Sequence, residues 1–247
     1  MAAHGTTGTP DLVVEKFRKF DCRTDLAEQL SQRIIDIIDA DVSSKGKTSV
    51  AFSGGTTPKR MLESFFANLS KKKIAEGALT ITVADERMVP LSHERSNFAM
   101  LKEAVGNSCI KTSIVPLFSG DDAERTSVTP VVDRLSRHEL LPCSAIVLGM
   151  GTDGHTASWF AGSPNLPDLV DPQQPSPVLL TQSDEGEPRL TMTLSEIARA
   201  QNVFLHIEGE AKLDVFNAAM GDGPADELPI RHILRHPEAK VIVYWAP

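Results

Sequence analysis

Strand-like and helix-like stretches alternate along almost the whole of this 247-residue chain. The strand-like stretches run apolar through their centres and occupy residues 47–55, 79–87, 144–151, 189–193, 202–209 and 240–247. Apolar residues recur at helical spacing in residues 25–42, 58–69, 96–105, 130–141, 194–200, 210–220 and 228–236. Buried strands that alternate with helices are typical of a parallel sheet covered on both faces. The sequence therefore predicts an α/β fold with a mostly parallel, doubly wound, Rossmann-like sheet.

The first expected helix, residues 25–42, also indicates which of its faces is buried. One stripe along it is apolar and contains Leu26, Leu30, Ile34, Ile37 and Ile38. Asp25 and Glu28 offer a variant of the capping box, so we expect the helix to begin there.

One domain is expected over residues 25–247, preceded by an N-terminal extension and lead-in of residues 1–24. The stretch that most resembles a linker is 163–177, whose five prolines exclude a long helix. Because it follows a loop with candidate catalytic residues, we interpret it as a functional surface loop and not as a domain boundary.

Charge and cysteine content limit the possible partners. The net charge of −8 argues against nucleic acid or an anionic membrane, since both need a basic face. Cys22, Cys109 and Cys143 are widely spaced and form no CxxC pattern, which is typical of reduced thiols in a cytosol-like compartment. With no signal-peptide layout and no bilayer-length apolar stretch, we expect a soluble cytoplasmic protein. The oligomeric state stays open, with a monomer favoured.

Polar and glycine-rich loops follow several of the expected strands. They are "SGGTTP" (53–58), "ADERMV" (84–89), "GMGTDGH" (149–155) and "EGEAK" (208–212). In open parallel sheets, ligands bind at the carboxyl ends of the strands. We therefore expect these loops to form one site.

The loop of residues 53–58 is a candidate phosphate cradle. Gly54 and Gly55 allow the backbone to approach a ligand, and a helix that starts near Pro58 would point its free N–H groups at the same place. Hydroxyl donors come from Ser53, Thr56 and Thr57. The alternative is a tight strand-to-helix turn that needs glycine only for its geometry, because neither dinucleotide nor P-loop spacing is present.

The loop of residues 149–155 adds a candidate general base. Histidine is the side chain most often used as a general base near neutral pH, and Asp153 can hold one ring nitrogen of His155 and fix the tautomer. The alternative is that His155 only caps a helix or fills the loop. No GxSxG nucleophile elbow occurs, and neither His155 nor the His232 and His236 pair has the further ligands of a zinc site.

Six ordered motifs carry a resemblance to a known family. They are "SGGTTP", "DER", "RSNF" (95–98), "LGMGTDGHTAS" (148–158), "PRLTMT" (188–193) and "GEAK" (209–212). In order and spacing they resemble the 6-phosphogluconolactonases, from about residue 25 to the C-terminus. Thr56, Trp159 and Ala161 stand where that family usually has serine, leucine and proline.

The resemblance implies hydrolysis of 6-phospho-glucono-δ-lactone in the pentose phosphate pathway, without a metal or organic cofactor. It implies that the loop of residues 53–57, Arg189 and Lys212 bind the phosphate, and that His155, oriented by Asp153, activates water. Arg87 and backbone N–H groups of the loop around Gly151 are candidates to stabilise the carbonyl oxygen, although Arg87 could contact the phosphate instead.

Two alternatives stay open at this point. The related glucosamine-6-phosphate deaminases share the glycine loop and the DGH core, but they carry a glutamate-containing segment where this chain reads "TASWFAGSP". A non-catalytic sugar-phosphate sensor would keep the phosphate loop and lose the base, whereas this chain has both Asp153 and His155.

Overall fold

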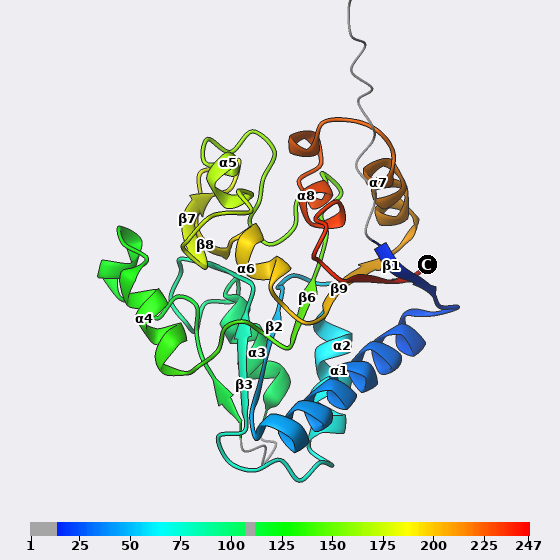
Figure 1. The fold of residues 1–247 in the computed structure, drawn as a ribbon, viewed down its shortest axis with the longest axis vertical. Helices are drawn as coiled ribbons and strands as arrows, with labels where there is room; N and C mark the ends of the chain where they lie inside the picture. The colour runs from blue at the N-terminus through cyan, green and yellow to red at the C-terminus, as the bar shows by residue number, and fades with distance from the viewer. Residues whose placement is uncertain (1–13, 107–111) are drawn as a thin grey trace, which may run out of the picture.

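A seven-stranded sheet, in which every neighbouring pair of strands is parallel, forms the centre of the computed structural model (Figure 1). The structure describes residues 14–106 and 112–247. Across the sheet the order is β1-β10-β9-β6-β2-β3-β5. In chain order these strands are β1 (Val14–Lys19), β2 (Thr48–Phe52), β3 (Leu79–Val83), β5 (Ser113–Ile114), β6 (Ala145–Leu148), β9 (Val203–Glu208) and β10 (Val241–Ala246). This topology confirms the expected doubly wound α/β fold.

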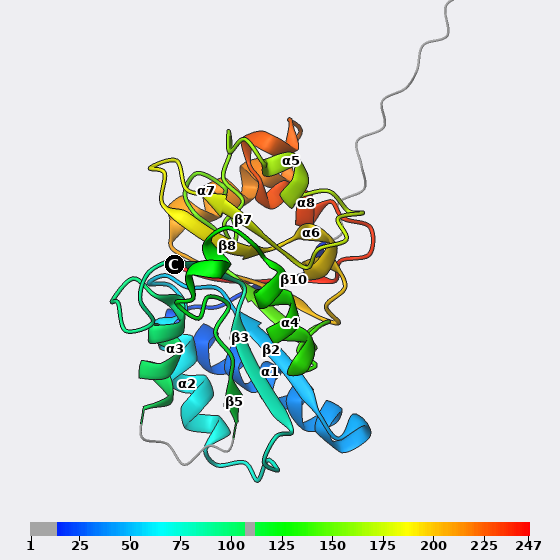
Figure 2. The same cartoon turned by 90° about the vertical axis from the view of Figure 1, so that its left-hand side faces the viewer.

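The direction of each crossover assigns the helices to the two faces of the sheet. The chain steps one way across the sheet through α1 (Arg23–Lys45), α2 (Lys59–Leu69) and α3 (Asn97–Val105). It steps back through α4 (Thr129–Arg137), α6 (Leu194–Ala198), α7 (Glu210–Met220) and α8 (Ile230–Leu234). Because such crossovers are right-handed, the two sets cover opposite faces. In Figures 1 and 2, α1, α2 and α3 accordingly lie together, well away from α7 and α8.

A second, three-stranded antiparallel sheet was not foreseen. Its order is β4 (Asp85–Arg87), β8 (Pro188–Met192) and β7 (Val178–Gln182). The prediction of one continuous strand over 79–87 is therefore wrong. Ala84 divides it, because its N–H donates to Phe52 of the large sheet while its carbonyl accepts from Met192 of the small one.

The predicted apolar stripe of α1 is buried, but the predicted cap is wrong. Leu26, Leu30 and Ile34 have no exposed surface. The helix begins at Arg23, and the sulfur of Cys22 accepts the N–H of Asp25 at 3.5 Å. Asp25 therefore lies in the first turn, where its charge still favours the positive end of the helix dipole.

Other expectations meet the structure only in part. The proline-rich stretch holds the four-residue α5 (Leu166–Leu169) and leads into β7. Short 3₁₀ turns occur at η1 (Asp122–Arg125) and η2 (Ala225–Glu227).

Cys22 and Cys143 are free thiols, whereas Cys109 lies outside the described residues. Among the helices of the described ranges, none has the length and apolar character needed to cross a membrane.

Candidate active site

The four polar loops follow four strands that are neighbours in the sheet, β9, β6, β2 and β3. The direction in which successive crossovers step across the sheet reverses between the parallel neighbours β6 and β2, and ligands of open α/β sheets bind at such a switch point. A cavity of about 260 Å³ lies there. Its lining is Ser53, Gly54, Gly55, Thr56, Thr57, Asp85, Arg87, Asn97, Gly149, Met150, Gly151, His155, Ala157, Arg189 and Lys212. Nine of the ten predicted site residues are in this set, and the tenth, Asp153, reaches the site through His155.

His155 and Asp153 form the candidate acid–base pair. The ring Nδ1 of His155 lies 2.6 Å from Asp153 Oδ1, and the same oxygen accepts the backbone N–H of His155 at 3.2 Å. The hydrogen bond from His155 lowers the pKa of Asp153, so this carboxylate stays charged. Nδ1 therefore carries the proton, and Nε2 of the neutral ring is the nitrogen with a free lone pair.

Two glycines allow this loop to fold so tightly. A Cβ on Gly151 would lie 2.2 Å from Asp153 Oδ1 and 2.3 Å from His155 Nδ1, so any side chain there would force the pair to shift. Gly154 has φ +78° and packs against Leu228, where a Cβ would come within 2.6 Å of a side-chain carbon. The glycines are thus required by the close packing of the pair as well as by the turn.

Lys212 reaches the glycine loop that follows β2. Its Nζ donates to Thr57 Oγ1 at 2.9 Å, and burial lowers the pKa of its ammonium group. Helix α2 begins just after this loop, and its N-cap residue, Pro58, supplies no side-chain cap. A cation and hydroxyl groups therefore line the cavity directly before the N-terminus of α2, a position that favours an anionic ligand.

Arg87 and Arg189 also line this cavity, and they are direct partners across β4 and β8. Arg189 is 8% exposed, and burial lowers the pKa of its guanidinium. Arg87 Nε, Arg189 Nε and Ser53 Oγ are all buried without a hydrogen-bond partner among the described residues. Buried donors normally have acceptors, so this part of the cavity is suited to a ligand that brings oxygen atoms.

Asn97 belongs to the RSNF motif of residues 95–98, for which the sequence alone predicts no role. Its Nδ2 donates to the Asp85 carbonyl at 2.8 Å, and its Oδ1 accepts from Arg87 at 3.1 Å. That oxygen would lie 1.8 Å from a Cβ on Gly54, so Gly54 is needed for close approach to Asn97. The glycine signal was visible in the sequence, whereas its partner was not.

Phe160 and Trp159 were also not assigned a role, and they fix the segment after His155. The Phe160 ring centroid lies 4.8 Å from that of His155 and 5.6 Å from the guanidinium carbon of Arg189. Trp159 has no exposed surface, and its indole N–H donates to the Met192 carbonyl at 2.9 Å. The departure to tryptophan at this position is thus accommodated by a bond to β8.

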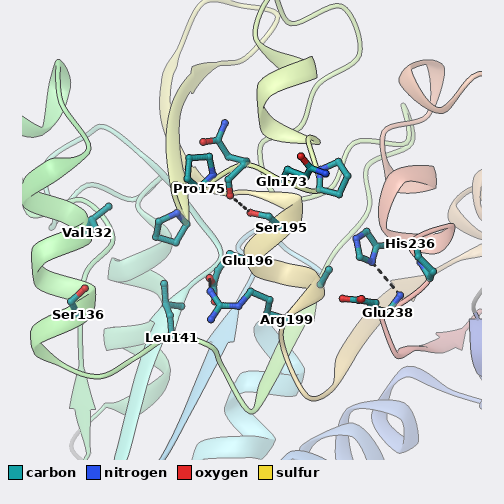
Figure 3. A pocket seen from close by; sticks show the side chains of 15 residues that line it. Val132, Ser136, Leu141, Gln173, Pro175, Ser195, Glu196, Arg199, His236 and Glu238 are labelled. Carbon is teal, nitrogen blue, oxygen red and sulfur yellow. Dashed lines mark hydrogen bonds and ion pairs between the residues drawn. The ribbon is translucent and has the colours of Figure 1, made fainter.

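A larger cavity, of about 800 Å³, lies elsewhere, between α4, the proline-rich stretch, α6 and residues 236–238 (Figure 3). None of the predicted site residues lines it. His236 lines this larger cavity and accepts the Glu238 N–H, whereas the His232 side chain pairs with Asp226. Within residues 14–106 and 112–247, no group of three or more His, Cys, Asp and Glu side chains is arranged for a metal ion.

Comparison with known proteins gives consistent results. Residues 21–244 match the family described as glucosamine-6-phosphate isomerases/6-phosphogluconolactonase. A 6-phosphogluconolactonase of Mesorhizobium japonicum is 38% identical over 92% of this chain and 94% of its own, and one of Rhizobium meliloti is 35% identical over 92% and 97%. A crystal structure of a 6-phosphogluconolactonase from Shewanella baltica superposes with a TM-score of 0.85 at 29% identity, covering 96% of this chain and 100% of that one.

Proposed function

The chain belongs to the family of glucosamine-6-phosphate isomerases and 6-phosphogluconolactonases, and from this premise we propose that it hydrolyses 6-phospho-glucono-δ-lactone to 6-phosphogluconate in the pentose phosphate pathway. The observation that carries this proposal is the His155–Asp153 pair in one cavity with Arg87, Arg189 and Lys212. A base next to a cluster of cations suits water attack on a substrate that bears a phosphate.

His155 acts as the acid–base group of the proposed reaction. Nε2 takes a proton from water as the water oxygen bonds to the lactone carbonyl carbon. The tetrahedral intermediate then collapses, the bond to the ring oxygen breaks, and Nε2 returns the proton to that oxygen. Asp153 keeps the ring in the required tautomer and stabilises the imidazolium form between the two steps.

The cations divide into two roles in this proposal. Arg189, Lys212 and the loop of residues 53–57 bind the phosphate. Arg87 and the N–H groups of the loop around Gly151 stabilise negative charge on the carbonyl oxygen as the intermediate forms. Phosphate binding remote from the reacting carbon positions the lactone under His155.

The deaminase activity within the same family is disfavoured by the segment after His155. Residues 156–164 contain no carboxylate, and Ser158 in this segment donates to Asp85 at 2.7 Å. A proton shuttle between adjacent sugar carbons would lack an acidic partner there.

We also propose a small sugar phosphate as the partner, with no nucleic acid, and a cytoplasmic location in keeping with the two free thiols.

Parallel assays on one preparation test the proposed function. Lactone opening is coupled to a 6-phosphogluconate dehydrogenase and corrected for spontaneous hydrolysis, first with the phosphorylated lactone and then with plain glucono-δ-lactone. Ammonia release from glucosamine 6-phosphate is measured beside them. We expect a preference of several orders of magnitude for the phosphorylated lactone and no ammonia. Equal rates on the two lactones, or ammonia well above background, would contradict the proposal.

A further inference from the structure

One ion pair outside the cavity lining connects the two arginines of the site. Arg95 Nη2 lies 2.9 Å from Glu187 Oε1, and Glu187 Oε2 in turn lies 2.7 Å from Arg189 Nη2. On the other side, the backbone carbonyl of Arg95 accepts from Arg87 Nη1 at 2.6 Å. Since Arg87 and Arg189 are cross-strand partners, the four residues form a closed ring of contacts.

Two loops far apart in the sequence meet in this ring. Glu187 ends the turn between β7 and β8, where its N–H and carbonyl both bond to Ser183. Arg95 lies between β4 and α3, and its N–H donates to His93 Nδ1 at 3.1 Å. Each partner therefore comes from a turn that is tied down locally.

We propose that Arg95 and Glu187 are positioning residues, which hold the guanidinium groups of Arg87 and Arg189 in the geometry that binds the substrate phosphate and carbonyl. This inference rests on the proposed function. Neither residue lines the cavity, so both act through the two arginines.

The physical need for such a pair comes from the arginines themselves. Two guanidinium groups side by side repel each other, and each long side chain loses conformational freedom when it is fixed. Glu187 supplies a countercharge to Arg189 on the side of Nη2, and Arg95 prevents Glu187 from turning away. The Arg95 side chain is 50% exposed, so the ion pair contributes little to folding, and its main effect falls on binding.

The test uses Glu187→Gln, Arg95→Ala and the double variant. We expect each single change to raise the KM for the phosphorylated lactone about tenfold, with kcat lowered less, as the loss of a charge-assisted contact predicts. The dissociation constant of 6-phosphogluconate, measured by calorimetry, should rise by the same factor. Because the pair acts as a unit, the double variant should be little worse than either single one.

Glu139→Gln is the matched control, since Glu139 forms an exposed ion pair with Lys47 far from the site. It should change neither KM nor the affinity for 6-phosphogluconate. Unchanged affinity in Glu187→Gln, or fully additive losses in the double variant, would overturn the inference. Calorimetry measures binding without turnover. If the wild-type protein failed the lactonase assay, the proposed function would be contradicted, but the effect of the variants on 6-phosphogluconate affinity could still be measured.

Discussion

The hydrogen bond between His155 Nδ1 and Asp153 decides which nitrogen of the imidazole can meet a substrate. With Nδ1 held at 2.6 Å from a charged carboxylate, only Nε2 can act as a base. His155→Ala should therefore lower kcat by about two to four orders of magnitude. Thermal unfolding should be nearly unchanged, because the ring is about one-third exposed, at 34% of its side chain.

Asp153→Asn and the exposed His138→Ala complete this experiment. Asparagine can still accept from Nδ1 but cannot stabilise an imidazolium by charge, so we expect kcat to fall at least about tenfold. His138, at the end of α4, serves as the control and should leave kcat unaltered. A folded His155→Ala protein with normal turnover would remove this residue from the mechanism.

Gly151 lies where a methyl group would collide with both members of the pair. Gly151→Ala should lower kcat by about one to two orders of magnitude, because displacement of a catalytic group by about 1 Å is enough for such a loss. Gly221→Ala at the end of α7 is the control, since its Cβ would meet the nearest backbone oxygen at 3.4 Å. Steady-state kinetics of the two variants, at matched folded fractions, would settle the point; equal activity would show that the loop relaxes freely.

Among the helices and strands, the sequence predicts those that bury an apolar face. It does not predict strand boundaries and pairings that depend on hydrogen bonds between distant segments. The stripe of α1 and the run of β6 follow directly from hydrophobic spacing. The break at Ala84 does not, because Leu79 to Arg87 reads as one strand until a second sheet pairs with Asp85. Likewise β8 was recognised as a strand, but its antiparallel partner β7 lies after a proline-rich stretch that shows little periodicity.

The same contrast applies to the candidate site. Glycine, histidine and basic residues at the ends of the strands predict that these loops form one site, because the carboxyl ends of neighbouring parallel strands lie at the same edge of the sheet. Asn97 and Glu187 could not be assigned in this way. Their positions depend on how α3 and the β7–β8 turn pack against β4, and local sequence does not encode that packing.

Helix α7 brings Lys212 to the glycine loop, and the burial of its ammonium group gives a pH dependence. Because burial lowers the pKa of Lys212, the positive charge is lost as pH rises through that lowered value. Affinity for 6-phosphogluconate should then weaken at alkaline pH. Lys212→Ala should bind 6-phosphogluconate more weakly than wild type by about 1.5–3 kcal/mol below that lowered value, and the difference should shrink as pH rises through it.

Lys212→Arg separates charge from position in this experiment. Its guanidinium stays protonated, so the alkaline loss of affinity should disappear even if binding is somewhat weaker overall. The measurement is the dissociation constant of 6-phosphogluconate across the alkaline range. An identical pH profile in Lys212→Arg and wild type would show that another group titrates.

At the scale of the whole molecule, stability should vary with pH because of Glu196 on α6, which lines the large cavity of Figure 3. This side chain is 3% exposed, and Oε1 is buried without a partner among the described residues, while Oε2 lies 2.9 Å from Arg199. Burial raises the pKa of Glu196 from 4.5 to about 7. Between these values the unfolded chain ionises its carboxyl group while the folded chain keeps the proton.

Stability from this group is therefore fully present below the unfolded pKa and is lost as pH rises through about 7. The free energy of unfolding falls by at most about 3 kcal/mol. In a chain of this size, each kcal/mol changes the melting temperature by about 2–4 °C. Glu196→Gln keeps the shape without titrating, so its melting temperature relative to wild type should increase between about pH 5 and about pH 8. Glu139→Gln, at an exposed carboxylate, should show no such trend. A constant difference between Glu196→Gln and wild type at both pH values would mean that Glu196 is ionised throughout, with its charge balanced by Arg199.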